Sequence, residues 1–118
     1  MANGWTVVEA NEEIDIVSAP LVHAAVIRRL AEDHRHFVLD LCSTHFLDSM
    51  GLGMIVAVTK RIKTRQGSLR IACSDERLLR VFFLGGLRHI YSFHDSVEQA
   101  IAQPPSEEGL AGWPGRRN

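Results

Sequence analysis

The chain has 118 residues, 46% of them hydrophobic, which is enough for one hydrophobic core but too few for two. Its 13 basic and 14 acidic side chains give a formal net charge of −1, which excludes a strong overall field for nucleic acid or for an anionic membrane. No apolar run approaches the roughly 18 residues of a membrane span, and residues 1–5 lack the basic start and apolar core of a signal peptide. A single cytoplasmic domain that binds no nucleic acid directly is expected.

The N-terminal third predicts a strand followed by a helix. Aromatic and β-branched side chains at 5–10 favour an edge or near-edge strand, and residues 11–13 have the composition of a turn. Ser18 and Pro20 are residue types of a helix N-cap and of a first helical turn. Apolar residues then recur at helical spacing at Val22, Ala25, Val26 and Leu30. Residues 34–36 end this helix.

Residues 37–42 are almost continuously apolar, which is typical of a central strand covered on both faces. Asp40 interrupts this run, and a buried carboxylate needs hydrogen-bond donors or a charged partner. Near the carboxyl end of the strand it is expected to accept from turn N–H groups around Ser49, as a support of that loop rather than as a catalytic acid. Cys42 and Cys73 each end a strand-like apolar run and are expected to be free, buried thiols, because neither belongs to a CxxC pair.

Residues 46–53, with the sequence FLDSMGLG, connect the central strand to an amphipathic helix that is expected to begin near Gly51. This arrangement places Ser49 at or just before a helix N-terminus. The N–H groups of a first helical turn lack partners and carry partial positive charge, so a phosphate on Ser49 would meet backbone donors. A simpler interpretation also stands, in which Asp48 or Ser49 is only an N-cap and the glycines only ease a tight turn.

The helix after this loop is predicted from five residues that share one face, namely Leu52, Ile55, Val56, Thr59 and Ile62. Gly67 is the expected stop of the helix. A basic cluster at Lys60, Arg61, Lys63 and Arg65 occupies its last turns. Cations there complement the helix dipole, so a solvated face is favoured over a binding patch.

The following segments predict two further strands and two further helices. Residues 69–73 form a strand, after which Ser74 is expected to cap a helix. The apolar face of that helix consists of Leu78, Leu79, Phe82 and Phe83. A short strand at about 89–93 precedes a final helix, where Asp95 and Glu98 stand at capping-box spacing.

Strands that alternate with helices through short loops imply βαβ units and a mostly parallel sheet. From residue 103 the sequence changes to proline, glycine and charged residues that cannot bury a face. The expected organisation is therefore one α/β domain over 1–102 and a disordered C-terminal tail over 103–118.

Five segments of the chain resemble the STAS-domain family of anti-sigma factor antagonists, in the order that the family has them: 13–15, 37–41, 48–53, 85–87 and 93–100. The DSMGLG sequence at 48–53 is the most specific of these segments. The resemblance extends over about residues 7–101. It implies the STAS fold, a small, mostly parallel or mixed sheet of four or five strands backed by about four helices.

The resemblance also implies a partner-switching protein without enzymatic activity of its own. The unmodified form would bind an anti-sigma factor that has serine kinase activity, and phosphorylation of the motif serine would block this binding. A serine phosphatase is the implied second partner. The motif serine is Ser49 in this sequence, and the implied partner-binding residues are Asp15, Asp48, Ser49, Met50, Gly51 and Leu52, with Asp40 as the loop support.

Two other functions stay open. A STAS-type ligand-binding module or transporter-associated regulatory subunit would use the serine loop only as a turn or a small-anion site, without a phospho-switch. An enzyme would use Ser49 as a nucleophile, but a G-x-S-x-G elbow is missing. The histidines show no HExxH or Cys/His spacing and no Walker-type loop occurs, so neither a metal nor a cofactor is predicted.

Overall fold

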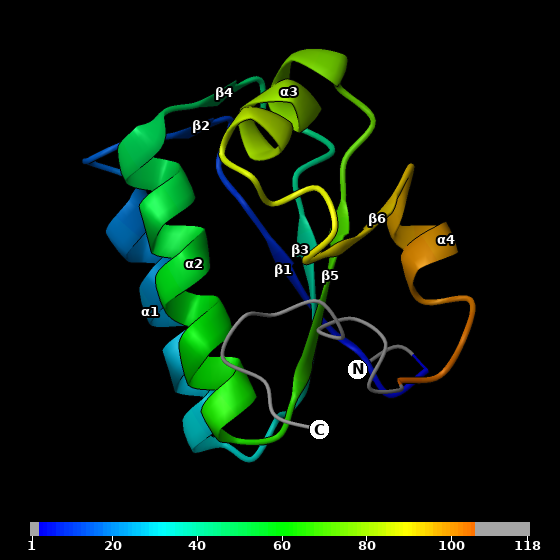
Figure 1. Cartoon of the computed structure of the whole chain (residues 1–118). Helices are drawn as coiled ribbons and strands as arrows, with labels where there is room; N and C mark the ends of the chain where they lie inside the picture. Colours follow the sequence, from blue (N-terminus) through cyan, green and yellow to red (C-terminus); the bar gives the residue numbers. More distant parts are fainter. Residues whose placement is uncertain (1–2, 106–118) are drawn as a thin grey trace.

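The computed structural model describes residues 3–105. Strands and helices alternate along most of the chain (Figure 1). The strands are β1 (Thr6–Glu9), β2 (Glu13–Ile14), β3 (His36–Asp40), β4 (Phe46–Leu47), β5 (Ser68–Ala72) and β6 (Ser92–His94). The helices are α1 (Ala19–Ala31), α2 (Ser49–Thr64), α3 (Glu76–Leu84) and α4 (Val97–Ala100).

The main sheet has the strand order β1-β3-β5-β6, with β1 at one edge as predicted. All three of its ladders are parallel. β2 and β4 form a separate short ladder, which is also parallel. Within residues 3–105, therefore, the paired strands form parallel ladders only, and the mixed sheet that the sequence left open is not observed.

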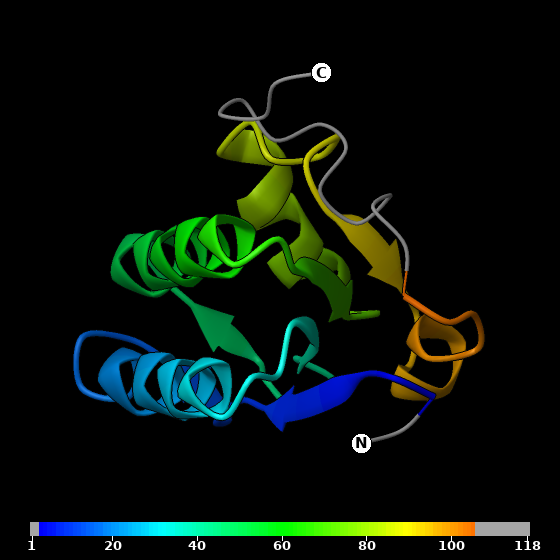
Figure 2. The same cartoon turned by 90° about the horizontal axis from the view of Figure 1, so that it is seen from below.

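The sheet is covered on both faces, as expected for its central strand. Helices α1, α2 and α3 lie over one face and the short α4 lies over the other (Figure 2). Side chains of the first face, such as Leu39 and Ile71, belong to the larger apolar cluster. Val38 and Ala72 point the opposite way and pack with Trp5 and Ala100 in a smaller cluster.

A buried arginine connects the segment that follows α4 to the sheet face that α4 covers. The guanidinium carbon of Arg70, in β5, lies 4.4 Å from the ring centroid of Trp5, in cation–π contact. Its Nη1 donates to the carbonyls of Ala100 at 2.6 Å and Gln103 at 3.3 Å, and Trp5 Nε1 donates to Gln103 O at 2.8 Å. Gln103 thus contacts the domain, whereas residues 106–118 of the expected tail lie outside the described residues.

Helix α3 and strand β6 are shifted relative to their predicted positions. Asp75, and not Ser74, is the N-cap of α3, and its carboxylate accepts from the N–H of Arg77 at 2.9 Å. β6 covers residues 92–94 rather than about 89–93. Neighbouring serine and aspartate side chains are both good caps, so backbone conformation decides between them.

The cap of α4 is also shifted by one residue. Asp95 and Glu98 were the predicted capping box, but Ser96 is the N-cap and its hydroxyl accepts from the N–H of Gln99 at 3.2 Å. The Gln99 side chain reaches back and accepts from the N–H of Asp95 at 3.3 Å. The arrangement resembles a capping box one residue later, except that the Gln99 side chain accepts from the residue before the N-cap rather than from the N-cap itself.

The two cysteines have different environments. Cys73 is a buried free thiol, as predicted. Cys42 is free but exposed, so the prediction that it is buried was wrong. It follows the end of β3, where the chain turns away from the sheet, and its N–H donates to Asp40 Oδ1 at 2.9 Å.

Basic side chains gather where α1 and α2 end. The two helices run side by side, and their C-terminal ends lie at the same end of the molecule (Figure 1). Arg65, just beyond α2, donates to the carbonyl of Leu30 near the end of α1 at 3.4 Å. The residues of this basic end are Arg28, Arg29, Lys60, Arg61, Lys63 and Arg65.

Two half-buried histidines in the β-sheet are expected to make the fold less stable in mild acid. Burial lowers the pKa of His36 from its usual 6.5, and Arg35 lowers it further. Burial also lowers the pKa of His94, with Arg70 adding to the shift and Asp95 opposing it. A histidine whose pKa is lower in the folded chain binds fewer protons there, so its contribution to stability is complete above about pH 6.5 and is lost as the pH falls from that value through the lowered pKa of the folded state.

The expected result is a lower urea midpoint of unfolding at about pH 5.5 than at about pH 7.5. The double variant His36→Gln/His94→Gln should show a smaller decrease between the two pH values. A double variant of His23 and His89, also to glutamine, is the control and should keep the decrease of the wild type. An equal decrease in all three proteins would show that other groups cause the acid sensitivity.

Candidate functional site

Ser49 is the first residue of α2, so the helix begins two residues earlier than the expected start near Gly51. Asp48 is the N-cap, and its Oδ1 accepts from the N–H of Gly51 at 2.9 Å. The interpretation of Asp48 as a cap is therefore confirmed. Ser49 itself is exposed, at a helix end where backbone N–H groups favour a negative charge.

Gly51 allows α2 to begin directly against β2. A Cβ atom at this position would lie 2.4 Å from the carbonyl oxygen of Ile14 and 2.7 Å from Leu47 Cδ1. The N–H of Asp48 also donates to Ile14 O, at 3.4 Å. Because β2 leads into α1, this close approach brings the loop before α1 beside Ser49.

That loop is held by Asp15. Its Oδ1 accepts from the N–H groups of Val17 at 2.9 Å and Ser18 at 3.0 Å, and these bonds lower the pKa of the carboxyl group from its usual 3.8. Ser18 was expected to cap α1 with its hydroxyl. It occupies the N-cap position, but its hydroxyl instead donates to the carbonyl of Glu13 and accepts from the N–H of Asp15 at 3.0 Å. Both side chains thus shape the loop.

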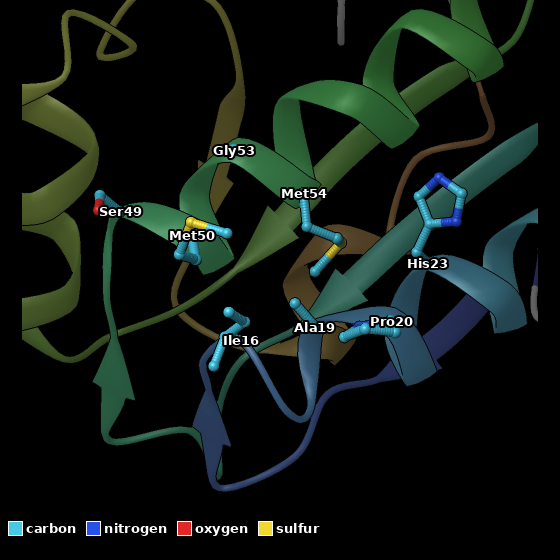
Figure 3. Close-up of a pocket in the computed structure, with 8 residues that line it drawn as sticks. All are labelled: Ile16, Ala19, Pro20, His23, Ser49, Met50, Gly53 and Met54. Atoms are coloured by element: carbon cyan, nitrogen blue, oxygen red, sulfur yellow. The ribbon is translucent and has the colours of Figure 1, made fainter.

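An apolar pocket of about 550 Å³ lies between the N-terminal ends of α1 and α2. Ser49 stands at one end of it and His23 at the other (Figure 3). The residues that line it are Ile16, Ala19, Pro20, His23, Ser49, Met50, Gly53 and Met54. Only Ser49 and Met50 of these were predicted as site residues.

Large apolar side chains around the pocket are exposed. The exposed fraction is 66% for Ile16, 78% for Val17 and 55% for Met50. Side chains of this kind are usually buried, and several exposed together mark a surface that contacts another molecule. The two consecutive apolar residues after Asp15 were the sequence signal that could have indicated this surface.

The segments that supply the pocket carry acidic but no basic side chains. Residues 1–27 and 36–59, which supply every pocket residue, contain no lysine or arginine. Glu12 and Glu13 are exposed at the start of β2, and Asp48 precedes Ser49. The surface around Ser49 therefore combines apolar side chains with negative charge.

Within residues 3–105, the Asp40 carboxylate has no hydrogen bond to the Ser49 loop. It accepts from the N–H of Cys42 and so supports the turn that directly follows β3. The predicted support of the Ser49 loop was wrong, because the chain between Asp40 and Ser49 first makes this turn and then the β4 strand. The support comes instead from Asp48 and from the close contact of Gly51 with β2.

The predicted partner-binding residues lie together at the start of α2 and on the adjoining loop. Ser49 and Met50 are exposed, and Asp15 and Asp48 are half-buried. Gly51 is buried, and Leu52 is half-buried and packs against the core. Their roles in binding stay predictions.

Residues 3–105 contain no group of three or more histidine, cysteine, aspartate or glutamate side chains arranged to hold a metal ion. Over the same residues, no helix is both long and apolar enough to span a bilayer.

Comparison with known proteins gives consistent matches. A family model described as STAS domain matches residues 2–100. The anti-sigma-B factor antagonist of Bacillus subtilis is 37% identical over 89 residues, which cover 75% of this chain and 81% of the relative. A Thermotoga maritima protein proposed to be an anti-sigma factor antagonist has a crystal structure with a TM-score of 0.79 and 25% identity, over 86% of this chain and 88% of that one.

The fold is also shared with SpoIIAA of Bacillus, an anti-sigma factor antagonist with structures of its phosphorylated and unphosphorylated forms. The TM-scores are 0.68 and 0.66, at 16% and 14% identity. The alignments cover 86% of this chain in both cases, and 92% and 89% of SpoIIAA. At this level of identity the similarity concerns the fold alone.

Proposed function

The chain belongs to the STAS-domain family, and from this premise we propose that it is an anti-sigma factor antagonist that acts by partner switching. The unphosphorylated protein binds an anti-sigma factor and thereby releases a sigma factor. Phosphorylation of Ser49 ends that complex. The exposed position of Ser49, at the edge of an apolar surface and on the first residue of a helix, is the observation that carries the proposal.

The geometry supports a switch that changes the surface without unfolding the domain. A phosphoserine adds nearly two negative charges. At the start of α2 these charges lie near unpaired N–H groups and the positive end of the helix dipole, so the fold tolerates them. At the pocket they lie beside apolar side chains that a partner would have to cover, and there the charge must lose its hydration.

The proposed partners follow from this mechanism. The anti-sigma factor is itself the serine kinase, and a serine phosphatase restores the binding form. The protein acts by binding and not by catalysis, in the cytoplasm, where sigma factors work.

Phosphorylation is expected on Ser49. The purified protein should gain one phosphate, measured by intact mass, when it is incubated with ATP and the kinase-type anti-sigma factor of its own genome. Peptide mapping should place this phosphate on Ser49, and the Ser49→Ala variant should gain none. Ser43 and Ser74 are exposed alternatives, so Ser43→Ala serves as the control that should still be phosphorylated.

Two outcomes would contradict the proposal in different ways. A phosphate found on Ser43 or Ser74 and never on Ser49 would refute the position of the switch. If no anti-sigma factor of the genome bound or modified the protein, partner switching itself would fail. The ligand-binding or transporter-associated role would then replace it.

A further inference from the structure

Gly53 is a glycine inside α2 for which the fold gives no packing reason. In a helix interior, glycine costs about 1 kcal/mol relative to alanine. Apart from its chain neighbours and the backbone of its own helix, a Cβ at Gly53 would have no heavy atom within 4 Å, in contrast to the Cβ at Gly51 two residues earlier, which would collide with Ile14. Gly53 is exposed and lines the pocket. A larger side chain at position 53 would therefore occupy the open space beside this residue.

We propose that this pocket receives an apolar side chain of the anti-sigma factor, that basic residues flank this side chain on the partner, and that Gly53 keeps the pocket open for it. The inference rests on the proposed function. It adds the chemistry of the partner surface and assigns Gly53 to the interface. The pocket adjoins Ser49, so the occupant would lie where a phosphate is added.

The lining of the pocket selects an apolar occupant. Met54 extends from α2 toward Ala19 at the start of α1 (Figure 3), and Met50 and Ile16 complete the apolar lining. Methionine side chains adapt their shape to a bound group. Pockets that a partner covers and desolvates near the centre of an interface hold the few aromatic or aliphatic side chains that contribute most of its affinity.

The charges around the pocket favour a partner with basic residues next to the apolar side chain that enters the pocket. The segments that form the pocket carry no lysine or arginine, whereas Glu12 and Glu13 are exposed at the start of the adjoining β2. Like charges facing each other across an interface are costly, so an acidic partner would be rejected. A partner with lysine or arginine beside its apolar side chain complements both properties.

The phosphate on Ser49 would act on this occupant directly. A dianion at one end of the pocket would have to be desolvated when the apolar side chain entered. The basic residues of the partner would lie over Glu12 and Glu13, which do not line the pocket, so they would not replace the lost hydration of the phosphate. The pocket thus links the modification to the loss of binding.

Substitutions of Gly53 are expected to weaken partner binding without destabilising the fold. Gly53→Ala should raise the thermal unfolding midpoint slightly, because alanine is the better helix former, and should weaken binding by a few-fold. Gly53→Leu fills the pocket and should weaken binding by about tenfold or more. Ala31→Leu adds similar bulk at an exposed position at the other end of α1 and is the control that should bind like the wild type.

The probe is the anti-sigma factor that phosphorylates the wild-type protein, and affinity is measured by titration calorimetry with circular dichroism as the check of folding. Folded Gly53→Leu that binds as tightly as the wild type would overturn the pocket proposal and leave the proposed function intact. Failure of the wild type to bind any anti-sigma factor would overturn both.

The charge complementarity has its own test with the same probe. The variant Glu12→Gln/Glu13→Gln should weaken binding several-fold at about 50 mM salt, and the difference should shrink at about 300 mM as screening increases. Glu98→Gln on α4 removes an exposed carboxylate on the other side of the sheet and should have no effect. Unchanged or tighter binding of the double variant would refute the basic character of the partner surface.

Discussion

Phosphorylation of Ser49 is expected to weaken binding to the anti-sigma factor by about 100-fold or more. Ser49 is exposed at the end of the apolar pocket, so its phosphate would be enclosed by the interface. Leaving a charge buried and unpaired in an interface costs about 2–5 kcal/mol or more, and each 1.4 kcal/mol corresponds to about tenfold in affinity. Ser49→Asp has one charge and lacks the phosphate oxygens, so its loss should be only partial.

Titration calorimetry with the unmodified, phosphorylated and Ser49→Asp proteins measures this series. Ser49→Ala should bind like the wild type, because the interface needs the shape of the helix start more than the hydroxyl. The control is stability: Ser49→Asp should change the free energy of unfolding by no more than about 1 kcal/mol, the size of a cap or dipole contribution. Equal affinity of all forms would place Ser49 outside the interface.

Gly51→Ala is expected to destabilise the fold by about 2 kcal/mol, despite the better helix propensity of alanine. The new Cβ would lie 2.4 Å from a backbone oxygen of β2, which cannot rotate away as a side chain can. Either α2 or the β2 strand must shift. Because the same contact positions the loop that Asp15 holds, partner binding should also weaken.

The same substitution two residues later is the matched comparison. Gly53→Ala has open space for its Cβ and should gain up to about 1 kcal/mol, so the two variants should change the free energy of unfolding in opposite directions. Urea denaturation of both variants measures this difference. Equal stabilities would mean that β2 and α2 do not approach each other as closely as described.

The order of strands and helices could be predicted from the sequence because hydrophobic periodicity is a local property. The start of α2 was predicted to within two residues, since Asp48 and Ser49 are typical of a helix start. The caps of α3 and α4 were each predicted one residue too early. Several adjacent residues there have suitable oxygens, and only the backbone geometry selects Asp75 and Ser96.

The pocket could not be predicted in the same way. It combines Ile16 with Met54 and Gly53, which are more than 30 positions apart, and only the packing of α1 against α2 brings them together. The prediction that Asp40 supports the Ser49 loop was wrong for a related reason. The polar groups available to a carboxylate at the end of a strand depend on the path of the next turn, which the residue pattern does not specify.

The basic side chains where α1 and α2 end lie at the opposite end of these helices from Ser49, Glu12 and Glu13, and of these basic residues Arg29 pairs with Glu32. A basic partner attracts the acidic end and repels the basic end, so the protein is expected to turn with the Ser49 end leading. Oriented approach shortens the rotational search and raises the association rate, an effect that salt screens. The association rate with a basic partner surface should therefore fall as the salt concentration rises, although the net charge of the chain is only −1.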